Sequence, residues 1–594
     1  MSRSAVRCTE RVAVLVPVAV MVALGLWGLD RGGIWRDEAA TFQVARRSPA
    51  QIWRMLHHVD AVHGLYYLLM HGVLALQPGE VLLRLPSVCG AAATAGLVAA
   101  LGSRLCRPRV GLWAGLLYAV TPMVGHYAQE GRSYALVAAG VAGATLLLLR
   151  AVRDGSWWPY GLVLAVTCVL HEFAVLVLLA HACALALARV PGRVWRGWAR
   201  AAGAVAVVLL PLALVSRGQS AQVAWLTPPN GRSVERLLRE FAGPSWAVLG
   251  PCLVLMAVAV LGPGARRGLS PAGVALPLML VPPAVLMAVS RVSPLYDDRY
   301  VLYSLAGAPL LVAAGADRVA GILRRAAGAT PPAAGGGRPY AAGVVARGPA
   351  PLVPRRPVPH GTAVAVRERP EVCVSGTRPV LRRLSVPRAR AVPGRRPRPP
   401  ASGAQPARRR HLGALVGAVL VCGALAVQFP LLRADRRAAN RPDDLAAVSA
   451  AVGRTVRPGE AVLFLPSLER RSALAYPAGF RGIRDVALDV PAAEDGTLYG
   501  REVGPRELRR RLGGLGYVWV IGEQYALRPS WTPRNATDRA KLAVVREEFV
   551  TRAEYVHRGV TLRLYVRPRS TRESRSAPPR PASGSARRGG PAGP

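Results

Sequence analysis

Eleven apolar stretches dominate this sequence, and they limit the folds that the chain can adopt. A helix that crosses a lipid bilayer needs about 20 predominantly apolar residues, and most of these stretches approach that length. Hydrophobic residues make up 52% of the 594 residues. The sequence therefore predicts a mainly α, polytopic membrane helical bundle. The stretches are 12–28, 85–103, 110–127, 133–150, 157–170, 173–188, 201–215, 245–262, 274–290, 299–316 and 411–429.

Arginine residues between the stretches predict the orientation of the chain. Loops on the cytoplasmic side of a membrane carry an excess of Lys and Arg. A cytoplasmic N-terminus places only Arg-bearing loops on that side: 104–109, 150–156, 189–200, 263–273 and 318–410. One outside segment departs from this pattern, because it contains Arg217, Arg232, Arg236 and Arg239. We expect a multi-pass cell-membrane protein whose C-terminal region is extracytoplasmic.

The apolar segment 64–76 has only about 13 residues, which is short for a span. Counting it as a span would place the Arg-rich loops outside. We therefore interpret it as a helix in the outer membrane interface, with Tyr66 and Tyr67 at the depth of the lipid headgroups.

Composition divides the chain into five parts. We predict a membrane core at 1–326, a disordered cytoplasmic insertion at 327–410, a last transmembrane span at 411–434, a small extracytoplasmic α/β domain at 435–568 and a disordered tail at 569–594. Within the α/β domain, the patterns predict helices over 443–456 and 505–512 and strands over 461–465, 517–521 and 554–566.

The insertion accounts for about a third of the net charge of +44. Residues 327–410 contain seventeen Arg and two Glu, together with many Pro, Gly and Ala residues and no apolar period. Such a segment cannot bury a core, and a misread reading frame is an alternative explanation for it. Since short basic loops account for the rest, we do not expect nucleic-acid binding.

The eight cysteines include no CxxC pair, so the sequence predicts neither a disulfide framework nor a thiolate metal site. No metal motif is visible, and the cofactor remains unknown.

Polar residues gather at the outer ends of the predicted helices. Asp37 and Glu38 directly follow the first apolar stretch, and a carboxylate pair at a membrane surface is costly to desolvate. One interpretation is a general base together with a positioning group. The alternative is a solvated acidic pair stabilised by a helix N-terminus. Further outer residues are His63, Glu130, Arg132, His171, Glu172 and Arg299.

These further residues also have structural interpretations. Glu130 and Arg132 can pair with each other, His63 can be a hydrated interfacial residue, and His171 with Glu172 can mark a turn. An arginine such as Arg299 can bind phosphate in a bidentate manner, or can be neutralised by Asp297 and Asp298.

Several motifs together resemble glycosyltransferase family 39, which includes protein O-mannosyltransferases and lipid A aminoarabinose transferases with the GT-C membrane fold. The resemblance covers roughly residues 10–316. The motifs are Trp35-Arg36-Asp37-Glu38-Ala39, His63-Gly64-Leu65-Tyr66-Tyr67, Leu83-Arg84-Leu85-Pro86-Ser87, Gln129-Glu130-Gly131-Arg132-Ser133-Tyr134 and Asp298-Arg299-Tyr300.

The resemblance implies an inverting, hexosyltransferase-type enzyme that moves a sugar, for example mannose, from a polyprenyl-phosphate donor on the outer face. It places Asp37 at the catalytic base, with Glu38 beside it. The implied partners are membrane lipid, the lipid-linked donor and a protein, polysaccharide or lipid acceptor. The implied substrate-binding residues are His63, Tyr66, Glu130, Arg132, Tyr134, His171, Glu172, Arg299 and Tyr300.

The chain also departs from the family, because Gly64-Leu65 stands where many relatives have Pro-Pro. A transporter or lipid-sugar flippase is the main alternative, since polar residues at helix ends also suit substrate passage. No inverted repeat is visible, however, and the acidic groups lie on one predicted face. A third interpretation is a non-catalytic scaffold that presents residues 435–568.

Overall fold

The computed structural model describes residues 3–30, 32–223, 225–262, 268–326, 407–437, 440–441, 443–533, 535–557 and 560–568. The described residues of 1–325 and of 408–568 form one compact unit. The predicted insertion, apart from 407–410, and the predicted tail from 569 lie outside the described residues.

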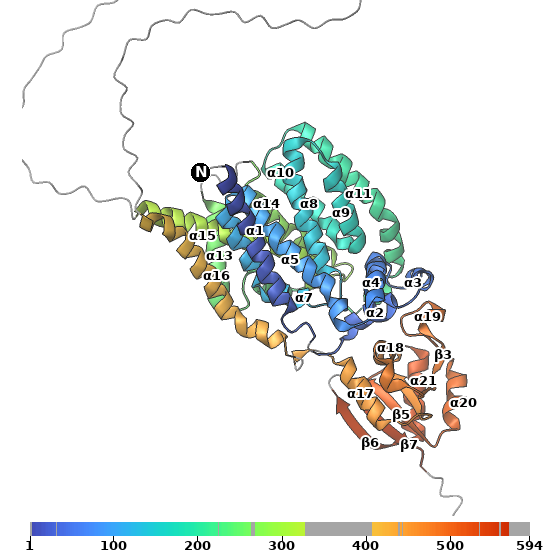
Figure 1. Cartoon of the computed structure of the whole chain (residues 1–594). Helices are drawn as coiled ribbons and strands as arrows, with labels where there is room; N and C mark the ends of the chain where they lie inside the picture. Colours follow the sequence, from blue (N-terminus) through green and yellow to red (C-terminus); the bar gives the residue numbers. More distant parts are fainter. Residues whose placement is uncertain are drawn as a thin grey trace, which may run out of the picture. The chain divides into compact units, whose positions relative to one another are not determined.

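Helices form most of the described chain, and the longest of them are apolar (Figure 1). Among the described residues, seven helices are long and apolar enough to cross a membrane. One further pair, α12 (Gly231–Ala242) and α13 (Trp246–Leu261), is bent by 81° and makes an eighth candidate if it counts as one span. The seven lie in α1 (Arg3–Leu26), α5 (Glu80–Leu105), α8 (Tyr134–Asp154), α11 (Gly192–Gly218), α14 (Pro271–Val289), α15 (Gly307–Ala326) with the η4 turns before it, and α16 (Ala407–Asp435).

The other three predicted stretches fall on shorter helices. Stretch 157–170 coincides with α9 (Trp158–Leu170), and 173–188 with η2 (Glu172–Leu176) and α10 (Val177–Leu187). Stretch 110–127 is divided between α6 (Pro108–Ala119) and α7 (Pro122–Ala128). Pro122 explains this break, because proline lacks an N–H and disfavours helical backbone in the preceding residue.

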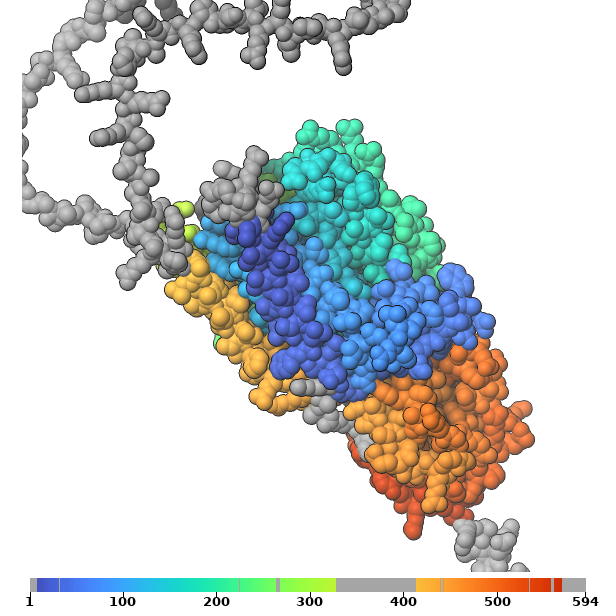
Figure 2. Space-filling model, in the orientation of Figure 1, coloured from blue at the N-terminus to red at the C-terminus, as the bar shows by residue number. Residues whose placement is uncertain are grey.

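Small residues let the bundle helices approach closely. A Cβ atom at Gly90 of α5 would lie 2.8 Å from the Ala135 carbonyl carbon of α8. Helix α1 lies at the surface of the bundle, where its side chains are visible in dark blue (Figure 2), and it exposes Val12 and Leu15. Small residues at helix contacts and apolar side chains on the outside are typical of membrane bundles. The protein is a multi-pass membrane protein.

The chain between α1 and α5 folds into short helices at one end of the bundle. These are α2 (Arg36–Ala45), α3 (Pro49–Leu56), η1 (Ala61–His63) and α4 (Gly64–Leu76). A capping box starts α3: the Ser48 side chain accepts a hydrogen bond from Gln51 N, and the Gln51 side chain accepts one from Ser48 N. Pro49 occupies the first helical position, where its missing N–H costs nothing. Helix α4 is the predicted interfacial segment 64–76.

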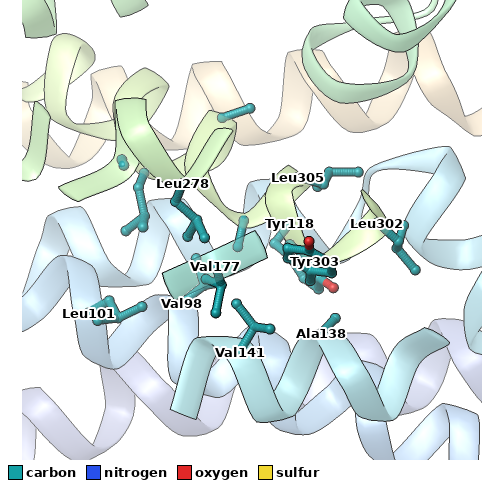
Figure 3. Packing of buried hydrophobic residues seen from close by; sticks show 14 of the residues in the cluster. Val98, Leu101, Tyr118, Ala138, Val141, Val177, Leu278, Leu302, Tyr303 and Leu305 are labelled. Atoms are coloured by element: carbon teal, nitrogen blue, oxygen red, sulfur yellow. The ribbon is translucent and has the colours of Figure 1, made fainter. Parts of the chain in front are cut away.

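A buried apolar core supports the segment that carries Arg299. The 3-10 segment η4 (Asp298–Ala306) buries Leu302 and Leu305, and the Tyr303 hydroxyl donates to the Phe173 carbonyl at 2.8 Å. Figure 3 shows side chains from α5, α6, α8, α10 and α14 gathered around this segment. The labelled members are Val98, Leu101, Tyr118, Ala138, Val141, Val177, Leu278, Leu302, Tyr303 and Leu305.

The C-terminal region contains a five-stranded sheet in the order β2-β1-β5-β7-β6. Strand β1 (Ala461–Leu465) is parallel to β2 (Arg484–Asp485) and β5 (Tyr517–Glu523), whereas β7 (Val560–Val566) is antiparallel to β5 and β6 (Val550–His557). A second sheet pairs β3 (Leu488–Val490) with β4 (Arg501–Glu502).

Helices cover both faces of the five-stranded sheet, which explains why every residue of β1 is buried. Helix α17 (Leu445–Thr455) packs on one face, and α20 (Pro505–Gly513) and α21 (Ala536–Glu548) pack on the other. The remaining short elements are η6 (Ser467–Arg470), α18 (Arg471–Ala475), η7 (Pro477–Phe480) and α19 (Ala492–Asp495).

The predicted fold class, a polytopic helical bundle with a small α/β region at the C-terminus, is confirmed. The prediction of a single strand over 554–566 is wrong, because the described residues of this range belong to the two antiparallel strands β6 and β7. The prediction of a helix from residue 443 is wrong at its start, because α17 begins at Leu445 after its N-cap Asp444 and Asp443 precedes the helix. The proposed domain boundaries and the sidedness of the membrane remain predictions.

Candidate active site

The first turn of α2 directs its two carboxylates to different surroundings. Successive helical residues point about 100° apart, so neighbours in sequence face different directions. Glu38 is fully buried, whereas the Asp37 side chain keeps 22% of its surface exposed. One carboxylate therefore joins the protein interior, and the other stays at the surface of a polar cluster.

Glu38 connects three segments of the chain. Its carboxylate accepts from Arg84 Nε and Nη2, both at 2.8 Å, and from Gly131 N at 3.0 Å. Arg84 also donates to the carbonyls of Leu29 and Gly33. This bidentate pair has no exposed surface, and its charges are satisfied by each other and by the backbone. These contacts indicate that Glu38 holds the segments around it together.

Asp37 forms an ion pair with Arg299. The two residues are 262 positions apart in the sequence and meet because η4 and α2 lie at the same end of the bundle. Arg299 Nε also lies 3.5 Å from Asp297 Oδ1. The guanidinium carbon is 5.9 Å from the Tyr134 ring centre and 5.6 Å from the Tyr300 ring centre, distances at which a cation is attracted to the ring face.

Arg132 brings a second guanidinium into this cluster. Its Nη2 atom lies 3.1 Å from His63 Nε2. Its Nε and Nη1 atoms are buried, and neither has a hydrogen-bond partner among the described residues. A buried N–H group without a partner costs about 1–3 kcal/mol. The two free donors of Arg132 therefore favour an anionic ligand with several acceptor oxygens.

Aromatic rings form one wall beside the two arginines. The His171 ring centre is 5.2 Å from that of Tyr300, 5.6 Å from that of Phe173 and 5.7 Å from that of Tyr134. His171 itself is buried. Such a wall offers flat, partly polar surfaces against which a sugar ring can pack.

Glu130 is a buried carboxyl group behind the cluster. It is only 3% exposed, and neither carboxylate oxygen has a hydrogen-bond partner among the described residues. Burial raises the pKa of the Glu130 carboxyl to about 7, although His126 and Arg299 oppose this shift. The residue is held by its backbone, because the Ser87 hydroxyl donates to the Glu130 carbonyl at 2.6 Å.

A cavity of about 540 Å³ adjoins these residues. His63, His171, Glu172 and Tyr300 line it together with residues at the C-terminal end of α11. Other side chains of α11 are apolar and exposed, among them Val208, Leu210 and Leu214. The cavity therefore lies between the polar cluster and a helix with an exposed apolar surface.

The remaining predicted residues have less direct positions. Glu172 accepts from the Ser216 hydroxyl at 2.7 Å at the edge of the cavity. Tyr66 is fully buried and packs in the core between α2 and α4. No group of three or more His, Cys, Asp or Glu side chains that could hold a metal occurs in the part of the chain that the structure describes.

Two predicted pairings differ from the observed contacts. No ion pair between Glu130 and Arg132 is found among the described residues, since Arg132 contacts His63 instead. Of the two aspartates beside Arg299, only Asp297 lies near its guanidinium among the described contacts. The Asp298 carboxylate instead binds Arg236 and the Tyr296 hydroxyl.

Sequence reasoning missed the partners that hold the cluster. Arg84 contributed to a motif but was given no role, and nothing local in the sequence pairs it with Glu38.

The Tyr67 hydroxyl donates to Asp60 at 2.7 Å, and Asp60 has a left-handed backbone with φ 57°. A non-glycine residue in that conformation is uncommon, and the bond to Tyr67 helps to hold it.

No protein-family model matches the chain, and no curated protein sequence matches it. Solved structures do resemble it. ArnT from Cupriavidus metallidurans in the apo state has a TM-score of 0.54 at 12% identity, over 93% of this chain and 97% of that one. The same protein bound to undecaprenyl phosphate has a TM-score of 0.49 at 12% identity, over 94% and 98%.

The archaeal oligosaccharyltransferase AglB from Archaeoglobus fulgidus, in complex with an inhibitory peptide and a dolichol-phosphate, has a TM-score of 0.40 at 10% identity. That match covers 95% of this chain and 74% of AglB. The likeness to apo ArnT, at its low sequence identity, establishes a shared fold and no more. The expected GT-C type of fold is thereby confirmed.

Proposed function

We propose that this protein is a membrane glycosyltransferase that uses a polyprenyl-phosphate sugar as donor. The observation that carries the proposal is the polar cluster itself. Asp37 is paired with Arg299, and Arg132 directs free donors into the same cluster beside a 540 Å³ cavity. A base, cationic groups for a phosphate and an apolar surface for a lipid tail are the three requirements of this chemistry.

The donor phosphate is the leaving group of the reaction, and it must be stabilised as its negative charge increases. We assign this role to Arg132 and Arg299, which both lie in the polar cluster, because arginine donors bind phosphate oxygens without needing a proton transfer. The isoprenoid tail would leave the cavity past α11, whose outer surface is apolar. His171, Tyr134 and Tyr300 would contact the sugar.

Asp37 is the proposed general base. It accepts the proton of the acceptor hydroxyl while the acceptor oxygen forms a bond to the anomeric carbon. The bond between that carbon and the phosphate oxygen breaks, and polyprenyl phosphate leaves with the bonding electron pair. Attack opposite the leaving group inverts the anomeric configuration. We propose a hexose, for example mannose, as the sugar, and a protein, polysaccharide or lipid as the acceptor.

The proposed orientation places this cluster on the outer side of the membrane. In α5, in α8 and in the continuous segment of η4 and α15, the Arg-bearing end lies opposite the first residue, which is Glu80, Tyr134 and Asp298, respectively. The positive-inside rule assigns the Arg-bearing ends to the cytoplasm. A lipid-linked donor would therefore be used from the outer leaflet.

Transfer of radiolabelled sugar tests the proposal. Membranes with and without the protein are supplied with a panel of polyprenyl-phosphate sugars, and both transferred label and free polyprenyl phosphate are measured. We expect one donor to give both products only when the protein is present. Movement of intact donor between leaflets without release of polyprenyl phosphate would instead identify a flippase and contradict the proposal.

A further inference from the structure

The C-terminal region contacts the chain directly before Asp37. The segment Gly33–Arg36 comprises the end of the connection between α1 and α2 and the first residue of α2, and Asp37 follows it. Four residues of the C-terminal region bind this segment, and we call them the clamp: Arg441, Asp443, Leu445 and Tyr476. All four are about 400 or more positions away in the sequence.

The clamp satisfies both backbone groups of Ile34. Its N–H donates to the Tyr476 hydroxyl at 2.8 Å, and its carbonyl accepts from Leu445 N at 3.3 Å. Ile34 is fully buried. Buried backbone groups need partners, and both of the partners that the described residues give to Ile34 come from the C-terminal region. The C-terminal region therefore completes the hydrogen bonding of this loop in the way that a neighbouring strand would.

Arg36 fixes the start of α2. Its Nε and Nη2 atoms donate to the two carboxylate oxygens of Asp443 at 2.7 and 3.0 Å. Asp443 is nearly buried, with 4% of its side chain exposed. A bidentate pair between a guanidinium and a carboxylate sets the direction as well as the distance. Helix α18 also packs against α2.

The loop fits closely against α17. A Cβ atom at Gly33 would lie 2.6 Å from Asp444 Oδ1 and 2.9 Å from Ala446 Cβ. The Gly33 carbonyl accepts from Arg441 Nη1 at 3.1 Å and from Arg84 at 3.2 Å. Tyr476 connects the C-terminal region to α5 as well, because its hydroxyl donates to the Glu80 carboxylate. Oε2 of Glu80 lies 3.8 Å from Nη1 of Arg84.

We infer that Asp443 and Tyr476 are positioning residues that hold the Asp37 carboxylate in place through Arg36 and Ile34. The inference rests on the proposed function for the role of Asp37. Arg36 is held by Asp443 and Glu38 is held by Arg84, so both sequence neighbours of Asp37 are fixed. The Asp37 carboxylate between them faces Arg299, with which it forms an ion pair. The C-terminal region thus completes the site without supplying a group that touches the substrate.

Amide hydrogen exchange tests the clamp without requiring any activity. The purified full-length protein is compared with Tyr476→Phe and Asp443→Ala variants in detergent. We expect faster exchange at Ile34 in Tyr476→Phe and across residues 33–38 in Asp443→Ala, because each change removes a bond that closes the loop. Glu554→Gln is the matched control. It breaks the 3.0 Å pair with Arg563 in the same region, far from the loop in sequence, and should leave this exchange unchanged.

Sugar transfer in the same variants tests the positioning role. A base displaced by about 1 Å can cost on the order of 100-fold in rate, so we expect a 10- to 100-fold lower kcat with an unchanged KM for the donor. Asp443→Glu, which keeps the carboxylate, should restore part of the rate. Unchanged exchange in both variants would overturn the clamp, and faster exchange with normal kcat would overturn the positioning role. Absence of transfer in the wild-type protein would instead contradict the proposed function, while exchange would still decide whether the clamp exists.

Discussion

Arg132 combines one histidine contact with two buried donors that have no partner among the described residues. Its planar guanidinium can give these donors to two oxygens of one phosphate, whereas a lysine ammonium acts as a point charge. The residue is thus suited to an anion of fixed geometry. The order of spans and loops in the sequence does not predict this arrangement. The structure is needed to show that Arg132 contacts His63 and has two donors without a partner among the described residues.

Arg132→Lys should therefore weaken donor use although it keeps the positive charge. We expect kcat/KM for the polyprenyl-phosphate donor to fall about 10-fold or more, since a charge-assisted hydrogen bond contributes about 1.5–3 kcal/mol. Arg217→Lys serves as a control, because Arg217 also borders the cavity but has no such contact with His63. Equal activity of Arg132→Lys and wild type would contradict a bidentate phosphate contact.

Glu130 should make the folded protein less stable as the pH rises. Burial raises its pKa from 4.5 to about 7, so the folded state keeps the proton over a range in which the unfolded chain releases it. The loss of stability starts near pH 4.5 and is complete above about pH 7, and it amounts to about 3 kcal/mol.

Glu130→Gln has no proton to lose and should remove this pH dependence. We expect its thermal unfolding midpoint in detergent to exceed that of wild type at about pH 8 and to equal it at about pH 4.5. A difference of the same size at both pH values would show that Glu130 does not titrate in this range.

At the scale of elements, the first turn of α2 carries two adjacent carboxylates with different partners and, in our proposal, different roles. Glu38 is tied to Arg84 on α5 and to Gly131 before α8, and Asp37 meets Arg299 of η4. Three elements that are far apart in sequence therefore converge on one helical turn. Loss of a buried partner should affect folding, whereas loss of the exposed carboxylate should affect chemistry.

Glu38→Gln should destabilise the protein, because it removes the bidentate carboxylate partner of the fully buried Arg84 and leaves only the 3.8 Å contact with Glu80. Removing one partner of a buried ion pair typically costs about 3–5 kcal/mol. Thermal unfolding in detergent would show a much lower midpoint for Glu38→Gln than for Asp37→Asn. A normal midpoint with abolished transfer would assign chemistry, not structure, to Glu38.

Local patterns predicted the elements well where one physical requirement dominates. Apolar stretches identified the helices, because a helix in lipid needs an uninterrupted apolar length. The sequence predicts one strand over 554–566, because the alternation with period two in β6 continues in β7 and does not show that the two strands are antiparallel. Asp443 was assigned to a helical first turn, and its bond to Arg36, 407 positions away, has no signature in local sequence.

At the scale of the whole molecule, the polar residues of the site lie at one end of the helices and most Arg-bearing loops lie at the other. Arg107 and Arg109 both bind Asp317, which joins the ends of α6 and α15 at the Arg-rich end. This asymmetry follows from the threading that the sequence predicts. The proposed use of an outer-leaflet donor therefore depends on the orientation of the whole chain in the membrane.

Thiol labelling in intact cells measures this sidedness. In a cysteine-free background, Arg509→Cys in the C-terminal region should react with a membrane-impermeant reagent, and Arg104→Cys should react only after lysis. Both positions are exposed in the structure, so accessibility differs only through the membrane. Labelling of Arg104→Cys alone in intact cells would reverse the orientation and place the site in the cytoplasm.

The most direct test of the central claim is sugar transfer by an Asp37→Asn variant that is inserted and folded normally. Loss of a general base costs about 10²–10⁴-fold in rate, so we predict that kcat falls by at least 100-fold with an unchanged unfolding midpoint. Asp489→Asn is the matched control, because it removes an exposed carboxylate 3.6 Å from Arg501 in the C-terminal region. It should transfer sugar at the wild-type rate. Near-normal turnover by Asp37→Asn would contradict the assignment of Asp37 as the base.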